Sequence, residues 1–241
     1  MQHQAQAEEE SLPAEVEAGL KMAWIGGKIC SIRLLSNFEN YRDSLENKHR
    51  VNPDLFKKDD WTTMPEAQQR QRLITWHSTY SSKFTWNDER KPRVILMIQG
   101  TSEAAVWQIC QQGFGVVGTT DDGFYGAGVY FTSKLGYADK YARGDGPNGT
   151  KPFLVSLVIP GNSFPVVEHP FAADGSGAAN PSGFKGKACR AGYQSHYTVV
   201  DGRDINTAFP IAGDIDPAVA ADELVTFEGA QALPIFVFYT R

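Results

Sequence analysis

The sequence predicts a protein of the α+β class, in which helices and strands occupy separate parts of the chain. Apolar residues recur every three or four positions in the first third of the 241 residues, whereas short apolar runs separated by long loops fill the rest. Strands and helices do not alternate regularly. The triplet Gly126-Ala127-Gly128 lacks the third glycine of a dinucleotide-binding turn and precedes a strand, which argues against a doubly wound nucleotide-binding fold.

The first fifty residues are expected to hold a polar tail, two helices and a strand. Residues 1–10 are polar and acidic, and a short helix is predicted near Pro13. The run KICSIRLL over residues 28–35 predicts a strand. Asn37 is suitably placed to cap a helix over residues 38–48.

A further helix is predicted from Pro65 to about Ser82, because proline suits the first position of a helix. The polar residues 85–92 that follow predict a loop. Four large apolar residues of this region are three to four positions apart, as on a buried stripe: Leu73, Trp76, Tyr80 and Phe84.

From Arg93 onward, apolar runs predict buried strands joined by loops. The run at 94–98 ends at Gln99-Gly100-Thr101-Ser102, where Thr101 or Ser102 can cap a helix over 103–112 that Gly113 ends. A second short helix is predicted at 133–142. Loops rich in small residues are predicted at 115–128 and 170–192, and further strands at 129–131, 153–159, 197–200, 223–227 and 235–240.

Composition narrows the classes of partner. The net charge of −5 disfavours a nucleic-acid partner, which needs a basic face. The three cysteines (Cys30, Cys110 and Cys189) show no CxxC spacing and are expected to be reduced thiols, and the histidines are scattered, so we predict no metal.

The sequence also bears on location. The start MQHQAQAEEE has neither the basic nor the apolar region of a signal peptide, and no window approaches eighteen apolar residues. We therefore expect a cytoplasmic or nuclear protein without a membrane partner.

Four segments combine residue types that could carry chemistry. They are Gln99-Gly100-Thr101 at the end of a predicted strand, GFYGAGVYF at 123–131, Tyr141, and Asp222-Glu223-Leu224-Val225 followed by QALP at 231–234. Each has an ordinary structural explanation on its own, because glycines after strands form turns and tyrosines pack in cores. Their order and spacing are more informative than any one of them.

In this order the segments resemble the catalytic domain of poly(ADP-ribose) polymerases, which are ADP-ribosyltransferases of the diphtheria-toxin type. That family has His-Gly-Ser/Thr at a strand end, then G-x-G-[IV]-Y-F with a second tyrosine eleven residues after the first. A glutamate-bearing strand that leads into a Q-x-x-P turn follows near the C-terminus. The matching stretches here are QGT (99–101), GAGVYF (126–131), Tyr141, DELVTF (222–227) and QALP (231–234). Residues 32–45 resemble the segment that opens the family's domain.

The resemblance implies an ADP-ribosyltransferase fold: two packed, mainly antiparallel sheets with flanking helices and a helical N-terminal extension. We expect residues 1–27 to form a disordered tail and a short helix, and residues 28–241 to form the catalytic domain. Within that domain, residues 28–92 would be mainly helical and residues 93–241 would form the NAD⁺-binding core.

The resemblance also implies a chemistry, which is cleavage of the nicotinamide–ribose bond of NAD⁺. Such a cleavage passes through an oxocarbenium-like state, which needs a carboxylate beside the sugar and a firmly held leaving group. By resemblance, Glu223 is the catalytic carboxylate and bonds the 2′-hydroxyl of the nicotinamide ribose. Tyr130 and Tyr141 hold the nicotinamide ring between them. The backbone of Gly100 clamps the carboxamide, where a side chain would obstruct the approach.

The same resemblance places Gln99, Thr101 and Phe131 beside NAD⁺, which is a substrate, and makes residues 115–126 a loop that covers it. Gln99 departs from the family, which has a histidine that bonds a hydroxyl of the adenine-side ribose; the glutamine amide offers both a donor and an acceptor. Ala138 departs as well, since a serine there contacts the carboxamide in the family. Ser133 or Thr101 are alternatives for that contact.

We expect transfer of single ADP-ribose units to a protein, because Gln99 breaks the His-Tyr-Glu set associated with chain growth. Three alternatives stay open: an NAD⁺ glycohydrolase, an NAD⁺-binding pseudoenzyme without turnover, and a transferase that modifies nucleic acid. Retention of Glu223 argues against complete inactivity.

Overall fold

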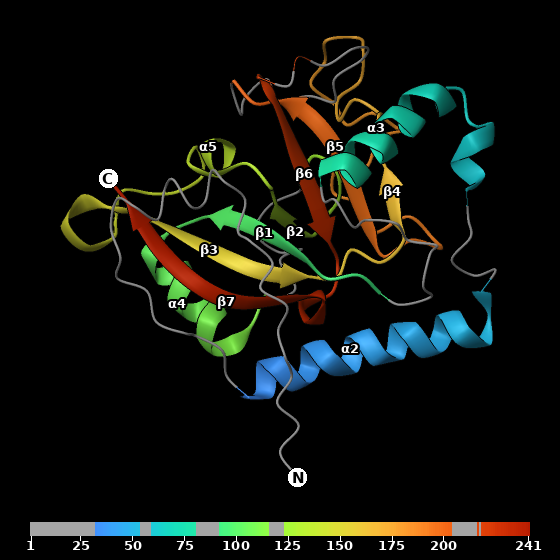
Figure 1. The fold of residues 1–241 in the computed structure, drawn as a ribbon. Coiled ribbons are helices and arrows are strands. Elements are labelled where there is room, and N and C mark those ends of the chain that lie inside the picture. The colour runs from blue at the N-terminus through green and yellow to red at the C-terminus, as the bar shows by residue number, and fades with distance from the viewer. Residues whose placement is uncertain (1–31, 54–58, 81–91, 116–122, 204–215, 217) are drawn as a thin grey trace.

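Two sheets form the centre of the protein in the computed structural model, which describes residues 32–53, 59–80, 92–115, 123–203, 216 and 218–241 (Figure 1). One sheet has the strand order β1 (Ile95–Gly100), β3 (Lys151–Val158), β7 (Ala232–Thr240). The other has the order β2 (Val129–Phe131), β6 (Ala220–Thr226), β5 (Ser195–Asp201), β4 (Ser163–Pro165). Neighbouring strands are antiparallel except β4 and β5, which confirms the predicted class and architecture.

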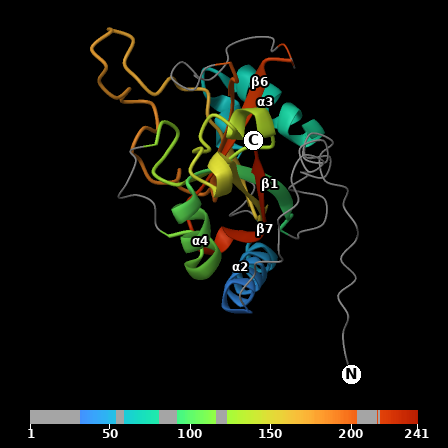
Figure 2. The same cartoon turned by 90° about the vertical axis from the view of Figure 1, so that its left-hand side faces the viewer.

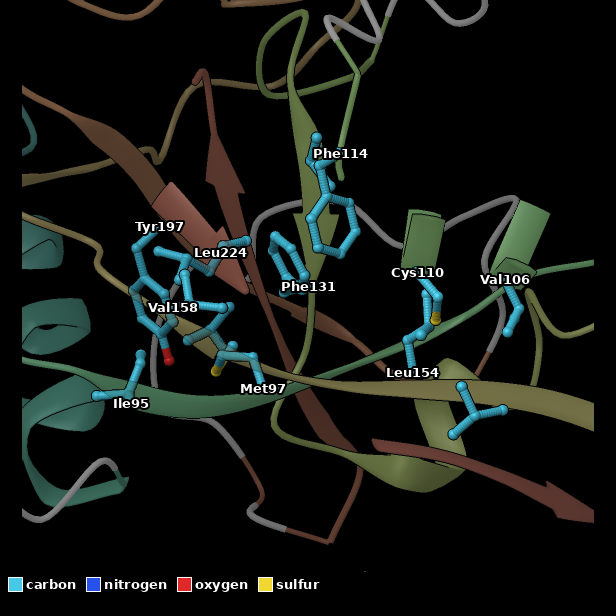
Figure 3. Close-up of a cluster of buried hydrophobic side chains, with 14 of the residues drawn as sticks. Ile95, Met97, Val106, Cys110, Phe114, Phe131, Leu154, Val158, Tyr197 and Leu224 are labelled. Carbon is cyan, nitrogen blue, oxygen red and sulfur yellow. The ribbon is translucent and has the colours of Figure 1, made fainter. Parts of the chain in front are cut away.

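The two sheets are joined where β1 meets the end of β2. Ile98 and Thr132 exchange both backbone hydrogen bonds, at N···O distances of 2.8 and 2.9 Å. The main core lies between the sheets, and Figure 3 shows some of its side chains. Met97 and Leu154 enter it from one sheet, and Phe131 and Leu224 enter it from the other. This core fixes the position of β6 relative to β1, on which the site described below depends.

Four described α-helices surround the sheets (Figures 1 and 2). They are α2 (Ile32–Val51), which contacts β7 and the turn before it; α3 (Ala67–Tyr80), which covers β4 and β5; α4 (Glu103–Gln112), which packs on β3 and β7; and α5 (Leu135–Ala138), which lies against the end of β1. Three 3₁₀ turns complete the described elements: η2 (Asp60–Thr63), η3 (Pro147–Gly149) and η4 (Gly229–Gln231).

The start of α2 corrects the sequence analysis. The helix begins at Ile32, so the predicted strand is wrong over residues 32–35. The reason is packing: Leu34, Phe38 and Leu45 lie on one helical face and bury against Ile159 and Leu233. The helical period therefore extends upstream of Asn37, which is an exposed residue inside the helix and not its cap.

The helix predicted after β1 is confirmed, together with its predicted capping residue and its terminating glycine. The Ser102 hydroxyl accepts the N–H of Ala105 at 3.3 Å as the cap of α4, and Gly113 ends the helix with φ 85°. Strand β4 was missed by the sequence analysis, because three residues are too short to show a period. The helix expected at 133–142 is shorter than predicted.

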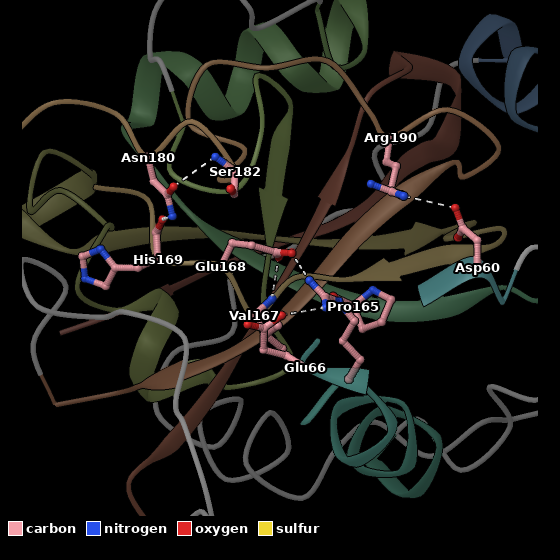
Figure 4. Close-up of polar contacts among 10 residues, drawn as sticks. Asp60, Glu66, Pro165, Val167, Glu168, His169, Asn180, Ser182 and Arg190 are labelled. Carbon is pink, nitrogen blue, oxygen red and sulfur yellow. Dashed lines mark hydrogen bonds and ion pairs between the residues drawn. The ribbon is translucent and has the colours of Figure 1, made fainter. Parts of the chain in front are cut away.

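Helix α3 confirms the helix predicted in this region, although it begins at Ala67 and not at Pro65, and its most deeply buried side chain is charged. Arg70 is fully buried; its Nε donates to the Pro165 carbonyl at 3.2 Å, and its guanidinium pairs with Glu66 at 3.4 Å and with Glu168. This network ties α3 to β4 and to Glu168 in the segment that follows β4. Figure 4 shows these partners and the separate Arg190–Asp60 pair. Leu73 is buried as expected.

Several predictions concern residues outside the described part of the chain, namely 1–31, 54–58, 81–91, 116–122, 204–215 and 217. They include the tail, the helix near Pro13, Phe84 and Cys30. Among the described residues, Cys110 and Cys189 are free thiols. No helix within those same residues has the length and apolar character needed to cross a membrane. The described ranges also hold no group of three or more His, Cys, Asp or Glu side chains that could bind a metal ion.

Candidate active site

Glu223 lies on β6, in the interior of the four-stranded sheet. The strand is buried along its whole length, and Glu223 itself is 7% exposed. Because side chains alternate along a strand, Glu223 and Val225 share one face. Tyr130 is paired with Val225 across β2 and β6 and so shares that face, whereas Asp222 faces the opposite side. The pairing of β2 with β6 thus brings two distant motifs of the sequence to one surface of the sheet.

Two tyrosines from α5 and the turn after it contact the Glu223 carboxylate. The Tyr137 hydroxyl donates to Glu223 Oε1 at 2.5 Å, and the Tyr141 hydroxyl lies 3.4 Å from the same oxygen. The two hydroxyl oxygens are 3.1 Å apart, and the rings meet edge to face with centroids 5.5 Å apart. Residues four apart share one face of a helical turn, which explains why both reach one carboxylate.

The environment of Glu223 favours the protonated form. Burial raises the pKa of Glu223 from 4.5 to about 7; the hydrogen bonds from Tyr137 and Tyr141 oppose this rise, and the charge of Asp222 adds to it. Burial and the Glu223 charge likewise raise the pKa of Tyr137, so its hydroxyl stays a donor. A carboxyl group with a pKa near neutrality can both accept and release a proton at physiological pH.

Tyr130 is fixed by the segment that precedes it. Its hydroxyl accepts the Tyr125 N–H at 2.8 Å and donates to the Gly126 carbonyl at 2.8 Å. Gly126 has φ 134°, and a Cβ there would lie 2.6 Å from the Phe227 ring, so only glycine fits this turn. The hydroxyl of Tyr130 is thus engaged with its own loop, whereas its ring stays on the Glu223 face.

His196 holds the same segment from β5. Its Nε2 accepts the Arg190 N–H at 2.9 Å, so its Nδ1 carries the proton and donates to the Tyr125 carbonyl at 2.6 Å. Burial lowers the pKa of His196 to about 4, which keeps the ring neutral. The segment that carries Tyr125 is therefore clamped to the sheet.

Gly100 ends β1 directly beside α5. A Cβ at this position would lie 2.0 Å from the Ala138 carbonyl oxygen, so no other residue fits without displacing α5. The backbone groups of Ile98 point to Thr132, away from β3. Those of Gly100, two residues later, point to the same side because the direction alternates along a strand. The Gly100 N–H and C=O therefore face Thr132 and α5.

The other predicted site residues lie in different surroundings. Gln99 has its Oε1 buried without a hydrogen-bond partner among the described residues. Thr101 joins the end of β1 to the segment after Tyr141, since its carbonyl accepts the Arg143 N–H at 3.0 Å. Phe131 is 2% exposed and packs on Phe114 in the core between the sheets, so its ring is on the opposite face from Tyr130.

The structure also bears on the departure at Ala138. Ala138 is buried against Gly100 and offers no hydroxyl. The Ser133 hydroxyl, a predicted alternative, donates to Asp222 at 2.7 Å on the far side of the sheet from Glu223. That interaction argues against a role for Ser133 on the Glu223 face.

Two tyrosines near Glu223, Tyr137 and Tyr125, were not among the predicted site residues. Tyr137 donates the shortest bond to Glu223, and its spacing of four from Tyr141 was a signal that could have revealed it. Tyr125 is 1% exposed. Its pKa is raised mainly by burial and secondly by the charge of Glu223, so its phenol lies within electrostatic range of that carboxylate. No local pattern in the sequence indicates Tyr125.

The paired sheets, the buried glutamate on β6 and the surrounding phenols define the class of diphtheria-toxin-type ADP-ribosyltransferases. Residues 63–239 match the family described as the poly(ADP-ribose) polymerase catalytic domain. This match spans most of the chain, which therefore belongs to that family, whose members use NAD⁺ as the substrate for ADP-ribosyl transfer. No relative among curated proteins matches the sequence.

Proposed function

We propose that this protein transfers single ADP-ribose units from NAD⁺ to a protein acceptor, with Glu223 as the catalytic residue. One observation carries the proposal: the Glu223 carboxylate lies on the same face of the sheet as Tyr130 and is bonded to the hydroxyls of Tyr137 and Tyr141. Family membership supports the reaction class.

The residues around Glu223 suit the nicotinamide end of NAD⁺. The Gly100 N–H and C=O face α5, where they can clamp a carboxamide, and any Cβ there would collide with Ala138. Tyr141 is 45% exposed, so its ring can be covered by a flat ligand. The buried Oε1 of Gln99 has no described partner and can accept a hydroxyl of the adenine-side ribose. Tyr130 and Tyr141 would then hold the nicotinamide ring.

Glu223 acts on the ribose in this proposal. Both tyrosine hydroxyls engage Oε1, and no described residue bonds Oε2, which leaves Oε2 for the 2′-hydroxyl of the nicotinamide ribose. As the glycosidic bond breaks, positive charge develops on the sugar, and the ionised carboxylate stabilises it. Tyr137 and Tyr141 hold the carboxylate in place, so little reorganisation is needed at that step.

The net charge bears on the class of acceptor, and Gln99 bears on the number of ADP-ribose units transferred. The net charge of −5 disfavours nucleic acid, and protein is the acceptor class that remains for macromolecular transfer. Gln99 replaces the family's histidine, so we propose transfer of single units and not chain growth.

The test is to incubate the intact protein with radiolabelled NAD⁺ and a mixture of acceptor proteins, and to measure every labelled product together with free nicotinamide. Nicotinamide release matched by label on discrete protein bands supports the proposal. A ladder of higher mass would show chain growth, and free ADP-ribose would show a glycohydrolase. NAD⁺ binding in a calorimeter without nicotinamide release would show a non-catalytic binder, and each of these three results contradicts the proposal.

A further inference from the structure

We infer that Asp222 is a positioning residue that anchors the turn between β2 and α5 and so places Tyr137 and Tyr141 against Glu223. The inference rests on the proposed function of Glu223, because it concerns how the carboxylate is held in its working position. Asp222 precedes Glu223 on β6 but faces the other side of the sheet.

One oxygen of Asp222 gathers the hydrogen bonds of this turn. Oδ1 accepts from Thr132 Oγ1 at 2.9 Å, from the Ser133 N–H at 2.8 Å and from Ser133 Oγ at 2.7 Å. The second oxygen lies 3.5 Å from the Tyr197 hydroxyl. Asp222 is 2% exposed, so these contacts are shielded from water. Three donors on one buried oxygen fix both residues of the turn.

The anchored turn leads directly into the tyrosines. Lys134, the cap residue of α5, donates its N–H to Thr132 Oγ1 at 3.1 Å, so the start of the helix is tied to the same group. Tyr137 follows three residues later and bonds Glu223. The chain from Thr132 to Tyr137 is thus fastened at both ends to two consecutive residues of β6.

Helix α5 depends on such an anchor because it is weak by itself. It has four residues and no side-chain cap, whereas isolated helices need about twelve or more residues to be stable in water. Its packing on β1 sets its distance from the sheet, because Ala138 meets Gly100 there. The bonds to Asp222 add a second fixed point, which defines the direction in which Tyr137 and Tyr141 project.

A carboxylate at this position is costly, which argues that it has a role. Burial raises the pKa of Asp222, and the hydrogen bonds from Ser133 and Thr132 oppose that rise. Its charge also contributes to the raised pKa of Glu223. An apolar residue would avoid both effects but would leave the Ser133 N–H and two hydroxyls buried without an acceptor.

Two substitutions separate anchoring from charge. Asp222→Asn keeps an oxygen that can accept the same three donors, whereas Asp222→Ala removes it. We expect Asp222→Ala to lower the kcat of nicotinamide release about 100-fold through misplacement of the tyrosines. We expect Asp222→Asn to stay within about threefold of wild type, since misplacement and not charge is the main loss. Thr226→Val, on the same strand, is the control: its buried hydroxyl has no described partner, and the variant should match wild type in kcat.

The pH profile adds a readout that a merely structural role would not change. The titratable groups around Glu223 are Asp222 on its own strand, Tyr137 and Tyr141 on the α5 side, and Tyr125 from the segment before β2. Among these groups only the charge of Asp222 raises the pKa of Glu223, whereas the hydrogen bonds from Tyr137 and Tyr141 lower it. Asp222→Asn should therefore shift the acid limb of kcat to lower pH. An Asp222→Asn variant as impaired as Asp222→Ala would overturn the anchoring role.

Amide hydrogen exchange tests the inference without any activity. Asp222→Ala should accelerate exchange over residues 134–141 by about tenfold or more, the equivalent of about 1.4 kcal/mol, while Asp222→Asn leaves it near wild type. Ser133→Ala removes one of the three donors and serves if Asp222→Ala does not fold; it should accelerate the same segment to a smaller degree. Unchanged exchange in every folded variant overturns the inference. A wild-type protein that releases no nicotinamide but shows the expected exchange pattern would instead refute the proposed function.

Discussion

Replacing Glu223 by glutamine should stabilise the fold at neutral and alkaline pH, because the buried carboxylate is held at a cost. The pKa of Glu223 is about 7 in the folded protein, against an ordinary value of 4.5. Each pH unit between these values corresponds to about 1.4 kcal/mol. Ionising Glu223 therefore costs the folded state about 3 kcal/mol, and Glu223→Gln removes this cost.

The sign follows from where the proton is bound. Between pH 4.5 and 7 the folded protein retains the Glu223 proton and the unfolded chain does not. The contribution of this proton to stability is thus complete below pH 4.5 and is lost as the pH rises through about 7. The free energy of unfolding of Glu223→Gln, minus that of wild type, should rise by about 3 kcal/mol across this window and stay constant above it.

Urea unfolding of both proteins at intervals from pH 4 to pH 8.5 measures this difference. His196, whose pKa burial lowers to about 4, is present in both proteins, so its titration cancels. Glu39→Gln, which replaces an exposed carboxylate on α2, is the matched control and should follow the wild-type profile. A Glu223→Gln profile parallel to wild type over the whole range would refute the account of a buried, proton-retaining carboxyl.

Three further substitutions test separate parts of the structure. Tyr141→Ala should weaken NAD⁺ binding about tenfold or more, since stacking on an aromatic ring contributes about 1–3 kcal/mol, and calorimetry measures the change. Gly100→Ala should destabilise the protein by about 1–3 kcal/mol and abolish nicotinamide release, because its Cβ collides with the Ala138 carbonyl; thermal unfolding and the release assay measure the two effects, and a fully active variant would contradict the clamp. Arg70→Ala should destabilise the protein by about 3–5 kcal/mol because it removes the cationic partner of Glu168, whereas the exposed Arg72→Ala should change stability little; equal urea midpoints for the two variants would contradict the buried network.

The elements that the sequence predicted best are those with complete local signals. The apolar run at 94–98 and the helix between Ser102 and Gly113 have such signals, and both form as expected. The start of helix α2 was predicted as a strand, because the apolar run KICSIRLL is typical of a strand when the packing partners of Leu34 are unknown. Those partners, Ile159 and Leu233, are more than a hundred residues away in sequence.

Only the site residues that belong to the recognisable sequence motifs could be predicted. Glu223 and Tyr141 were expected to converge, and the structure brings their side chains to 3.4 Å. Phe131 followed from its place in the motif, but strand alternation turns its ring into the core. Tyr125, in the segment before β2, and Asp222, which bonds Thr132 and Ser133, owe their places to contacts between segments far apart in the sequence, which no local spacing encodes.

The measurement that bears most directly on the central claim is the rate of nicotinamide release from NAD⁺ by wild type and by Glu223→Gln. The amide keeps the size of the side chain and can still contact Tyr137, but it carries no charge to stabilise the ribose as the bond breaks. We predict a rate at least about 100-fold below wild type. Equal rates in two proteins with the same fold would contradict the assignment of Glu223 as the catalytic residue.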